Sequence, residues 1–110
     1  MPANTITADR IAEYLLPRGC TIRRRFGGIE FLYQLHAVAG IWGELVMVGL
    51  TAADFAAAVQ LPGVRQHAPK RIQTDGHVVL SPERYDRDDE LELWLQRSWH
   101  YHIPDTPWER

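Results

Sequence analysis

The stretch that decides the fold is Arg25-Phe26-Gly27-Gly28-Ile29-Glu30-Phe31, in the first third of the chain. A bulky residue, two glycines and then alternating apolar residues are typical of a strand that bends sharply or lets another backbone approach closely. We therefore predict one strand over residues 21–33, broken or bent at the two glycines. In its second half Ile29, Phe31 and Tyr33 share a face, and the glycines shift the register as a bulge does.

Two short strands are expected after the bent strand. They cover residues 36–41 and 45–48 and are separated by Trp42-Gly43-Glu44, in which the glycine supplies an unusual φ. Residues 34–35 must reverse the chain, although Gln-Leu contains none of the usual turn residues. Neighbouring strands joined by such tight turns are antiparallel.

Two helices flank these strands. The first is expected from about Ala8 to Leu16, with Thr7 as its N-cap and apolar residues at helical spacing. The second is expected over residues 52–58, where alanines favour a helix and Thr51 begins a pattern that resembles a capping box.

The second half of the chain predicts a β-hairpin and a third helix. The hairpin is expected over residues 71–80 with Asp75-Gly76 as its turn, and the link over residues 64–69 is expected to be irregular. The helix is expected to start within residues 86–89, where acidic side chains suit its positive end. Its apolar face is formed by Leu91, Trp94, Leu95, Ser98, Trp99 and His102. We expect residues 103–110 to be a loosely ordered tail.

These elements predict an α+β fold of two layers, in the order α-β-β-β-α-β-β-α. Helices are expected to pack on one face of a twisted antiparallel sheet and to leave the other face open. With 110 residues the chain is expected to form one domain over residues 1–110. The open face is a candidate surface for a homodimer or another protein, because exposed apolar patches often mark contact surfaces. The contact surface is expected to consist of this open face and the aromatic tail; its residues are Phe31, Tyr33, Trp42, Met47 and Trp108.

Composition excludes several classes of protein. The net charge is −2, which gives no overall attraction to nucleic acid or to an anionic membrane. The single cysteine, Cys20, excludes an internal disulfide. The N-terminus has no pattern of a signal peptide, and no apolar stretch approaches the length of a membrane span. We therefore expect a cytoplasmic protein.

Motifs for catalysis or for metal and cofactor binding are not evident. His100 and His102 are spaced i,i+2, so on a helix their rings point apart and do not chelate a metal. The two glycines lack the Lys-Ser/Thr ending of a phosphate loop. An enzyme that uses His67 or His77 as a general base is a third, weaker hypothesis, because neither has a nucleophile partner visible in the sequence. We predict no catalytic residue, no metal and no cofactor.

Four basic residues support a second hypothesis. Arg23, Arg25, Lys70 and Arg71 would form a basic patch for phosphates if the hairpin lay near the first strand. The alternative is that strand alternation places Arg23 and Arg25 in solvent, with Arg24 in a salt bridge to the last helix. No recognition helix or aromatic RNA-binding motif accompanies them, so nucleic-acid binding is not the favoured function.

The chain resembles the N-terminal domain of the TfoX/Sxy family of competence regulators. The resemblance rests on the basic strand ending in Arg25-Phe26-Gly27-Gly28, the aromatic and apolar strands after it, and the final helix that begins with residues 88–95. It covers roughly residues 23–99. The Gly-containing turn of that family is replaced here by Gln34-Leu35, and a Lys that it often places after the third strand is replaced by Val48-Gly49. The MmcQ/YjbR group shares the general architecture.

The resemblance implies an α+β fold of the secretion-chaperone type and a bacterial, cytoplasmic protein without catalytic residues. Full-length members of the family act on transcription with the cyclic-AMP receptor protein. We therefore expect a regulatory or protein-interaction module, with a protein partner that belongs to the transcription machinery or with a second copy in a homodimer.

Overall fold

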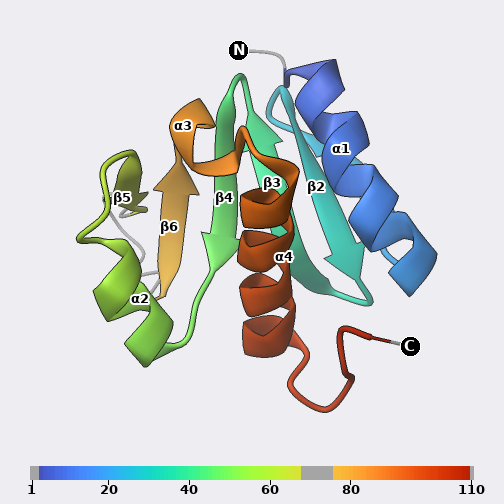
Figure 1. The fold of residues 1–110 in the computed structure, drawn as a ribbon. Coiled ribbons are helices and arrows are strands. Elements are labelled where there is room, and N and C mark those ends of the chain that lie inside the picture. Colours follow the sequence, from blue (N-terminus) through green and yellow to red (C-terminus); the bar gives the residue numbers. More distant parts are fainter. Residues whose placement is uncertain (1–2, 68–75, 110) are drawn as a thin grey trace.

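A six-stranded antiparallel sheet with helices packed on one face forms the structure (Figure 1), a computed structural model that describes residues 3–67 and 76–109. The order of strands across the sheet is β1-β2-β3-β4-β6-β5. The strands are β1 (Thr21–Arg25), β2 (Gly28–Tyr33), β3 (His36–Trp42), β4 (Leu45–Gly49), β5 (Val64–Gln66) and β6 (His77–Leu80). The helices are α1 (Thr5–Leu15) with a 3-10 turn η1 (Leu16–Arg18), α2 (Ala52–Ala58), α3 (Pro82–Tyr85) and α4 (Asp88–His102). The α+β class and the antiparallel sheet are confirmed, but the order of elements differs from the prediction.

The glycine stretch is a hairpin turn between two strands, so the prediction of one broken or bent strand over residues 21–33 was wrong. Arg25 lies opposite Gly28 in an antiparallel pair. Between them Phe26 and Gly27 have φ values of 53° and 77°, as a two-residue primed turn requires. A phenylalanine rarely adopts a positive φ, which is why the sequence did not read as a turn. Four strands therefore precede α2. The turn expected at residues 34–35 is present, with Gln34 at a φ of 55°.

The second half of the sheet also corrects a prediction. Residues 64–66, expected to be irregular, form the edge strand β5, which pairs antiparallel with β6. Only Val64 of its three residues is buried, so its sequence carries almost no strand pattern. The predicted partner strand over residues 71–74 and Asp75 of the predicted turn lie outside the described residues.

The three predicted helices are present, and the first one differs from the prediction at its start. Helix α1 begins at Thr5, and its N-cap is Asn4, whose Oδ1 accepts a hydrogen bond from the Thr7 amide at 3.1 Å. Thr7 is buried within the first turn and is not the N-cap. The other predicted cap is confirmed, because Thr51 Oγ1 accepts a hydrogen bond from the Asp54 amide at 3.4 Å. The short helix α3 was not predicted.

A buried serine forms hydrogen bonds that hold helix α4 against the middle of the sheet. The pairing of β2 with β3 shifts by one residue between Phe31 and Leu32, which leaves Val38 as the extra residue of a bulge. Ser98 is fully buried; its hydroxyl donates to the Val38 carbonyl and accepts from the Gly49 amide at 3.0 Å. One side chain therefore satisfies backbone groups of β3 and β4 and fixes α4 over both strands.

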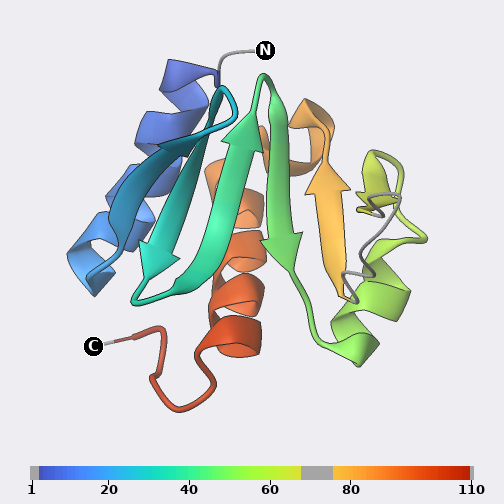
Figure 2. The same ribbon diagram turned by 180° about the vertical axis from the view of Figure 1, so that it is seen from behind.

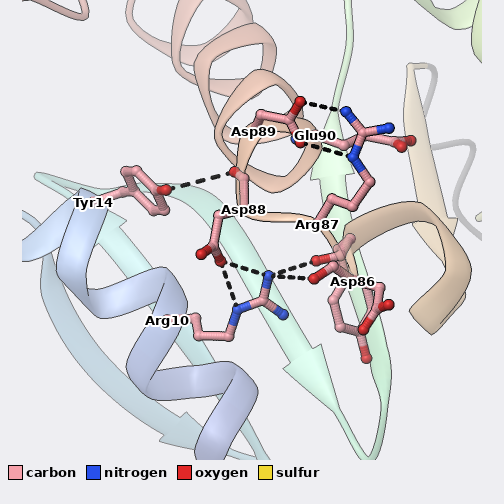
Figure 3. Close-up of polar contacts among 8 residues, drawn as sticks. Arg10, Tyr14, Asp86, Arg87, Asp88, Asp89 and Glu90 are labelled. Carbon is pink, nitrogen blue, oxygen red and sulfur yellow. Dashed lines mark hydrogen bonds and ion pairs between the residues drawn. The ribbon is translucent and has the colours of Figure 1, made fainter.

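Helix α1 is tied to the start of α4 by polar contacts (Figure 3). The Arg10 guanidinium donates to Asp88 Oδ1 at 2.9 and 3.2 Å, and to the carbonyls of Tyr85 and Asp86 at 2.8 and 3.0 Å. These bonds hold the α3–α4 junction against α1. Acidic residues therefore occupy the first turn of α4, as the sequence predicted for the positive end of the helix, and Asp88 and Asp89 also form ion pairs.

The segment after α4 is packed, so the expectation of a loose tail was wrong for residues 103–109. Ile103 and Trp108 are buried in the core cluster. The Arg18 guanidinium lies 3.5 Å from the centre of the Trp108 ring and donates to the Trp108 carbonyl at 2.8 Å. Trp99 Nε1 donates to the Thr106 carbonyl at 2.7 Å. Figure 1 shows this segment turning back below the sheet toward the end of α1.

Candidate functional site

One face of the sheet is uncovered (Figure 2), where the strands lie in front of α1 and α4. Among residues 3–67 and 76–109, no helix covers this side. The pairing places one row of residues across it, from Arg23 through Glu30, Gly40, Met47 and Val79 to Arg65. We call this surface the open face; its strand residues are Arg23, Arg25, Glu30, Trp42, Leu45, Met47, Arg65 and Val79.

Trp42 lies flat on the open face. A Cβ atom added at Gly28 would come within 2.3 Å of its Nε1, and one added at Gly40 within 2.5 Å of its Cζ3. The five-membered part of the indole therefore rests on Gly28 of β2, and the six-membered part on Gly40 of β3. Two positions without side chains leave room for an aromatic ring to lie against the backbone. The result is a fixed aromatic platform that stays partly exposed.

A shallow hollow of about 440 Å³ surrounds this platform. Its walls are mostly apolar, with Arg25, Glu30 and His67 as the polar members; the apolar ones are Phe26, Trp42, Leu45, Met47 and Val79. Phe26, at the tip of the β1–β2 turn, is 82% exposed. A hollow of this size accommodates one or two large side chains or a small ligand.

Charge on the open face is unbalanced. The Glu30 side chain is only 9% exposed, and its Oε1 accepts from Arg23 Nε at 3.0 Å and Nη2 at 2.8 Å. Arg25 Nε lies 3.9 Å from the same oxygen, beyond hydrogen-bonding distance. Arg65 is exposed at the other end of the row. The described strand residues of this face thus include three arginines and one carboxylate, and only Arg23 and Arg25 are near that carboxylate.

The predicted contact residues divide between the two faces. Trp42 and Met47 are on the open face. Phe31 and Trp108 are buried, at 0% and 3% exposure, so their prediction as surface residues was wrong. Tyr33 is partly buried against Trp99 of α4, with ring centres 4.9 Å apart. Strand alternation grouped residues within one strand, but it did not show that Phe31 lies on the face opposite Trp42 and Met47.

The structure describes two of the four residues of the predicted basic patch. Arg23 and Arg25 are together on the open face, beside Glu30. Lys70 and Arg71 lie outside the described residues. The sequence reasoning missed Phe26, Glu30 and Leu45; the alternation of Arg23 and Arg25 would have pointed to Glu30 once the hairpin turn at Phe26-Gly27 was recognised.

The histidines named as candidate bases are in different places. His67 lines the hollow, whereas His77 lies beside the last turn of α4. There the His102 ring is 5.6 Å from His77 and 6.3 Å from His36, measured between ring centres. Burial, followed by the nearby His77 and His36, lowers the pKa of His102 from 6.5 to about 4. Across the described ranges, no three His, Cys, Asp or Glu side chains are arranged to hold a metal ion.

A helix long and apolar enough to cross a bilayer is absent from the part of the chain that the structure describes. Comparison with known proteins adds no relative: no family model, no curated protein and no solved structure matches this chain.

Proposed function

We propose that this protein is a small, non-catalytic, regulatory protein-binding module of the bacterial cytoplasm, of the kind that its resemblance to the TfoX/Sxy N-terminal domain implies. The open face is its contact surface. The observation that carries this proposal is the indole of Trp42, laid flat over Gly28 and Gly40 inside an apolar hollow that no described helix covers.

Burial of this hollow by a partner would provide the energy of association. Apolar surface removed from water contributes about 25 cal/mol per Å². Tryptophan is enriched among the residues that dominate binding energy, particularly where its conformation is fixed before binding. Trp42 meets both conditions, because the two strands beneath it hold its ring in place.

The occupant that fits best is a segment of another protein that combines apolar and acidic side chains. Three arginines and one buried glutamate give the open face a positive rim around an apolar floor. Two copies of this chain placed face to face would bring like charges together, which opposes a homodimer through this surface. For nucleic acid, the Glu30 carboxylate in the middle of the arginines and the net charge of −2 are both unfavourable.

Site-specific photo-cross-linking in cells that express the protein tests this proposal. A photoreactive residue is introduced at Met47 on the open face and, as a matched control, at the exposed Glu13 of α1. We expect an adduct specific to position 47 with a different protein. The purified adduct partner should bind the wild-type chain and bind the Trp42→Ala variant at least about tenfold more weakly.

Three results would contradict the proposal. They are adducts that are identical at positions 47 and 13, adducts at position 47 that contain only a second copy of this chain, and adducts that contain only nucleic acid. The second would indicate a homodimer, and the third would support the basic-patch hypothesis.

A further inference from the structure

We propose that Arg25 selects the partner by binding a carboxylate next to an apolar side chain that occupies the hollow beside Trp42. This inference rests on the open face being the contact surface and assigns the recognition chemistry within it. It is carried by the contrast between two neighbouring arginines that face the same glutamate.

Arg23 is hydrogen-bonded to Glu30, whereas Arg25 is not. Two nitrogens of Arg23 donate to Glu30 Oε1, at 3.0 and 2.8 Å. Arg25 makes no hydrogen bond to the described residues, and its nearest carboxylate oxygen is 3.9 Å away. Its guanidinium lies 5.0 Å from the centre of the exposed Phe26 ring, and its side chain is half exposed. One carboxylate cannot give two guanidinium groups their full set of bonds, so Arg25 retains free donors.

The position of Arg25 places those donors at the edge of the hollow. Arg25 pairs with Gly28 in β1–β2, and Trp42 covers Gly28 from the next strand. Arg25 therefore borders the platform directly, and it lines the same hollow as Met47 and Val79. A guanidinium binds a carboxylate in a planar, two-bond geometry, and the neighbouring apolar floor reduces competition from water.

The spacing defines the recognised segment. Strands β1 and β3 are about 10 Å apart, which is two strand spacings. In an extended segment, side chains at i and i+2 lie on the same side about 7 Å apart. The arginine side chain is long enough to cover the rest of the distance between β1 and β3. The matching ligand is an extended peptide with a large apolar residue two positions from an aspartate or glutamate.

Arg24 provides a matched control for the proposed role of Arg25. Arg24 follows Arg23 and precedes Arg25 on the same strand, and it is also exposed. It pairs with Ile29, a buried residue of the helix-covered face, so alternation points Arg24 away from the hollow. Arg24→Gln and Arg25→Gln remove the same charge from the same strand, and only the second removes it from the hollow.

The test uses the full-length purified protein and short synthetic peptides that carry Phe and Glu two positions apart in a Ser/Gly background. A matched peptide has Gln in place of Glu. Binding is followed by tryptophan fluorescence, which reports on Trp42 because Trp94, Trp99 and Trp108 are at most 3% exposed. The Trp42→Phe variant supplies the background signal.

We expect the Glu peptide to bind wild type about tenfold more tightly than the Gln peptide, as a charge-assisted pair provides. Arg25→Gln should remove this preference, and Arg24→Gln should retain it. Equal affinity of the two peptides for wild type, or an unchanged preference in Arg25→Gln, would overturn the role of Arg25 while leaving the open face as a binding surface.

Two further outcomes separate this inference from the proposed function. If neither peptide binds at concentrations up to roughly 1 mM, the inference is overturned, and the cross-linking at Met47 decides the function independently. If a single-stranded oligonucleotide changes Trp42 fluorescence and the peptides do not, both proposals fail.

Discussion

Protonation of His102 should destabilise the folded protein as the pH falls from 6.5 toward 4. The ring lies in the last turn of α4, 4.9 Å from Tyr101 and 5.6 Å from His77 between ring centres. A Cβ added at Gly49 would come within 2.8 Å of His102 Nε2, so the ring is packed against the end of β4. His36 of β3 also faces this ring, and Asp105 lines the recess beyond it.

The magnitude follows from the pKa of His102, which burial and the neighbouring histidines lower from 6.5 to about 4. At about 1.4 kcal/mol for each pKa unit, the difference corresponds to about 3 kcal/mol at most. Solvent contact of the partly buried ring and the favourable end of the α4 dipole reduce this to about 2 kcal/mol. Between the two pKa values the unfolded chain binds a proton that the folded protein excludes. This contribution to stability is therefore complete above pH 6.5 and is lost as the pH falls to 4.

Urea denaturation between pH 7 and pH 4 measures this effect. Carboxylates also titrate in this range, so the informative quantity is the difference in pH dependence between wild type and His102→Gln. The variant should lose about 2 kcal/mol of the pH dependence. His100→Gln, on the exposed side of the same helical turn, should behave as wild type does. If His102→Gln has the pH dependence of wild type, the reasoning about the buried ring is refuted.

Three other predictions concern single residues. Ser98→Ala should lower the free energy of unfolding by about 2 kcal/mol in chemical denaturation, because two buried backbone groups lose their partner; an unchanged midpoint would contradict this. Gly40→Ala should displace the Trp42 ring, since the new Cβ would lie 2.5 Å from Cζ3, and acrylamide should then quench the tryptophan fluorescence more strongly. Burial raises the pKa of the Cys20 thiol to about 11, so a thiol reagent at pH 8 should label it slowly in the folded protein and rapidly in urea; equal rates would argue against its burial.

Periodicity predicted the helices and the class of fold. The helix over residues 52–58 has a cap and a composition that act locally, and the apolar face of the last helix repeats over about three turns. Both signals depend on neighbouring residues alone. The hairpin at Phe26-Gly27 was missed because its first position carries a bulky residue at a positive φ, which the surrounding pairing of β1 with β2 imposes.

The candidate site was predicted only in part, for a similar reason. Strand alternation grouped Arg23 with Arg25, and it identified Trp42 and Met47 as surface candidates. It did not show that Phe31 faces the helices, because that depends on where α1 and α4 pack. The burial of Trp108 depends on Arg18, which is 90 positions away in the sequence. Contacts at such separation leave no local pattern in the chain.

The indole on two glycines also restricts how this sequence can vary. Positions 28, 40 and 42 are on two different strands, yet a larger residue at either glycine position is compatible only with a smaller one at position 42. Related chains should therefore fall into two groups. In one group an aromatic residue at position 42 lies over glycines at positions 28 and 40, and in the other all three positions carry small side chains. Members of the second group would have lost the platform and, with it, the contact surface that we propose for this chain.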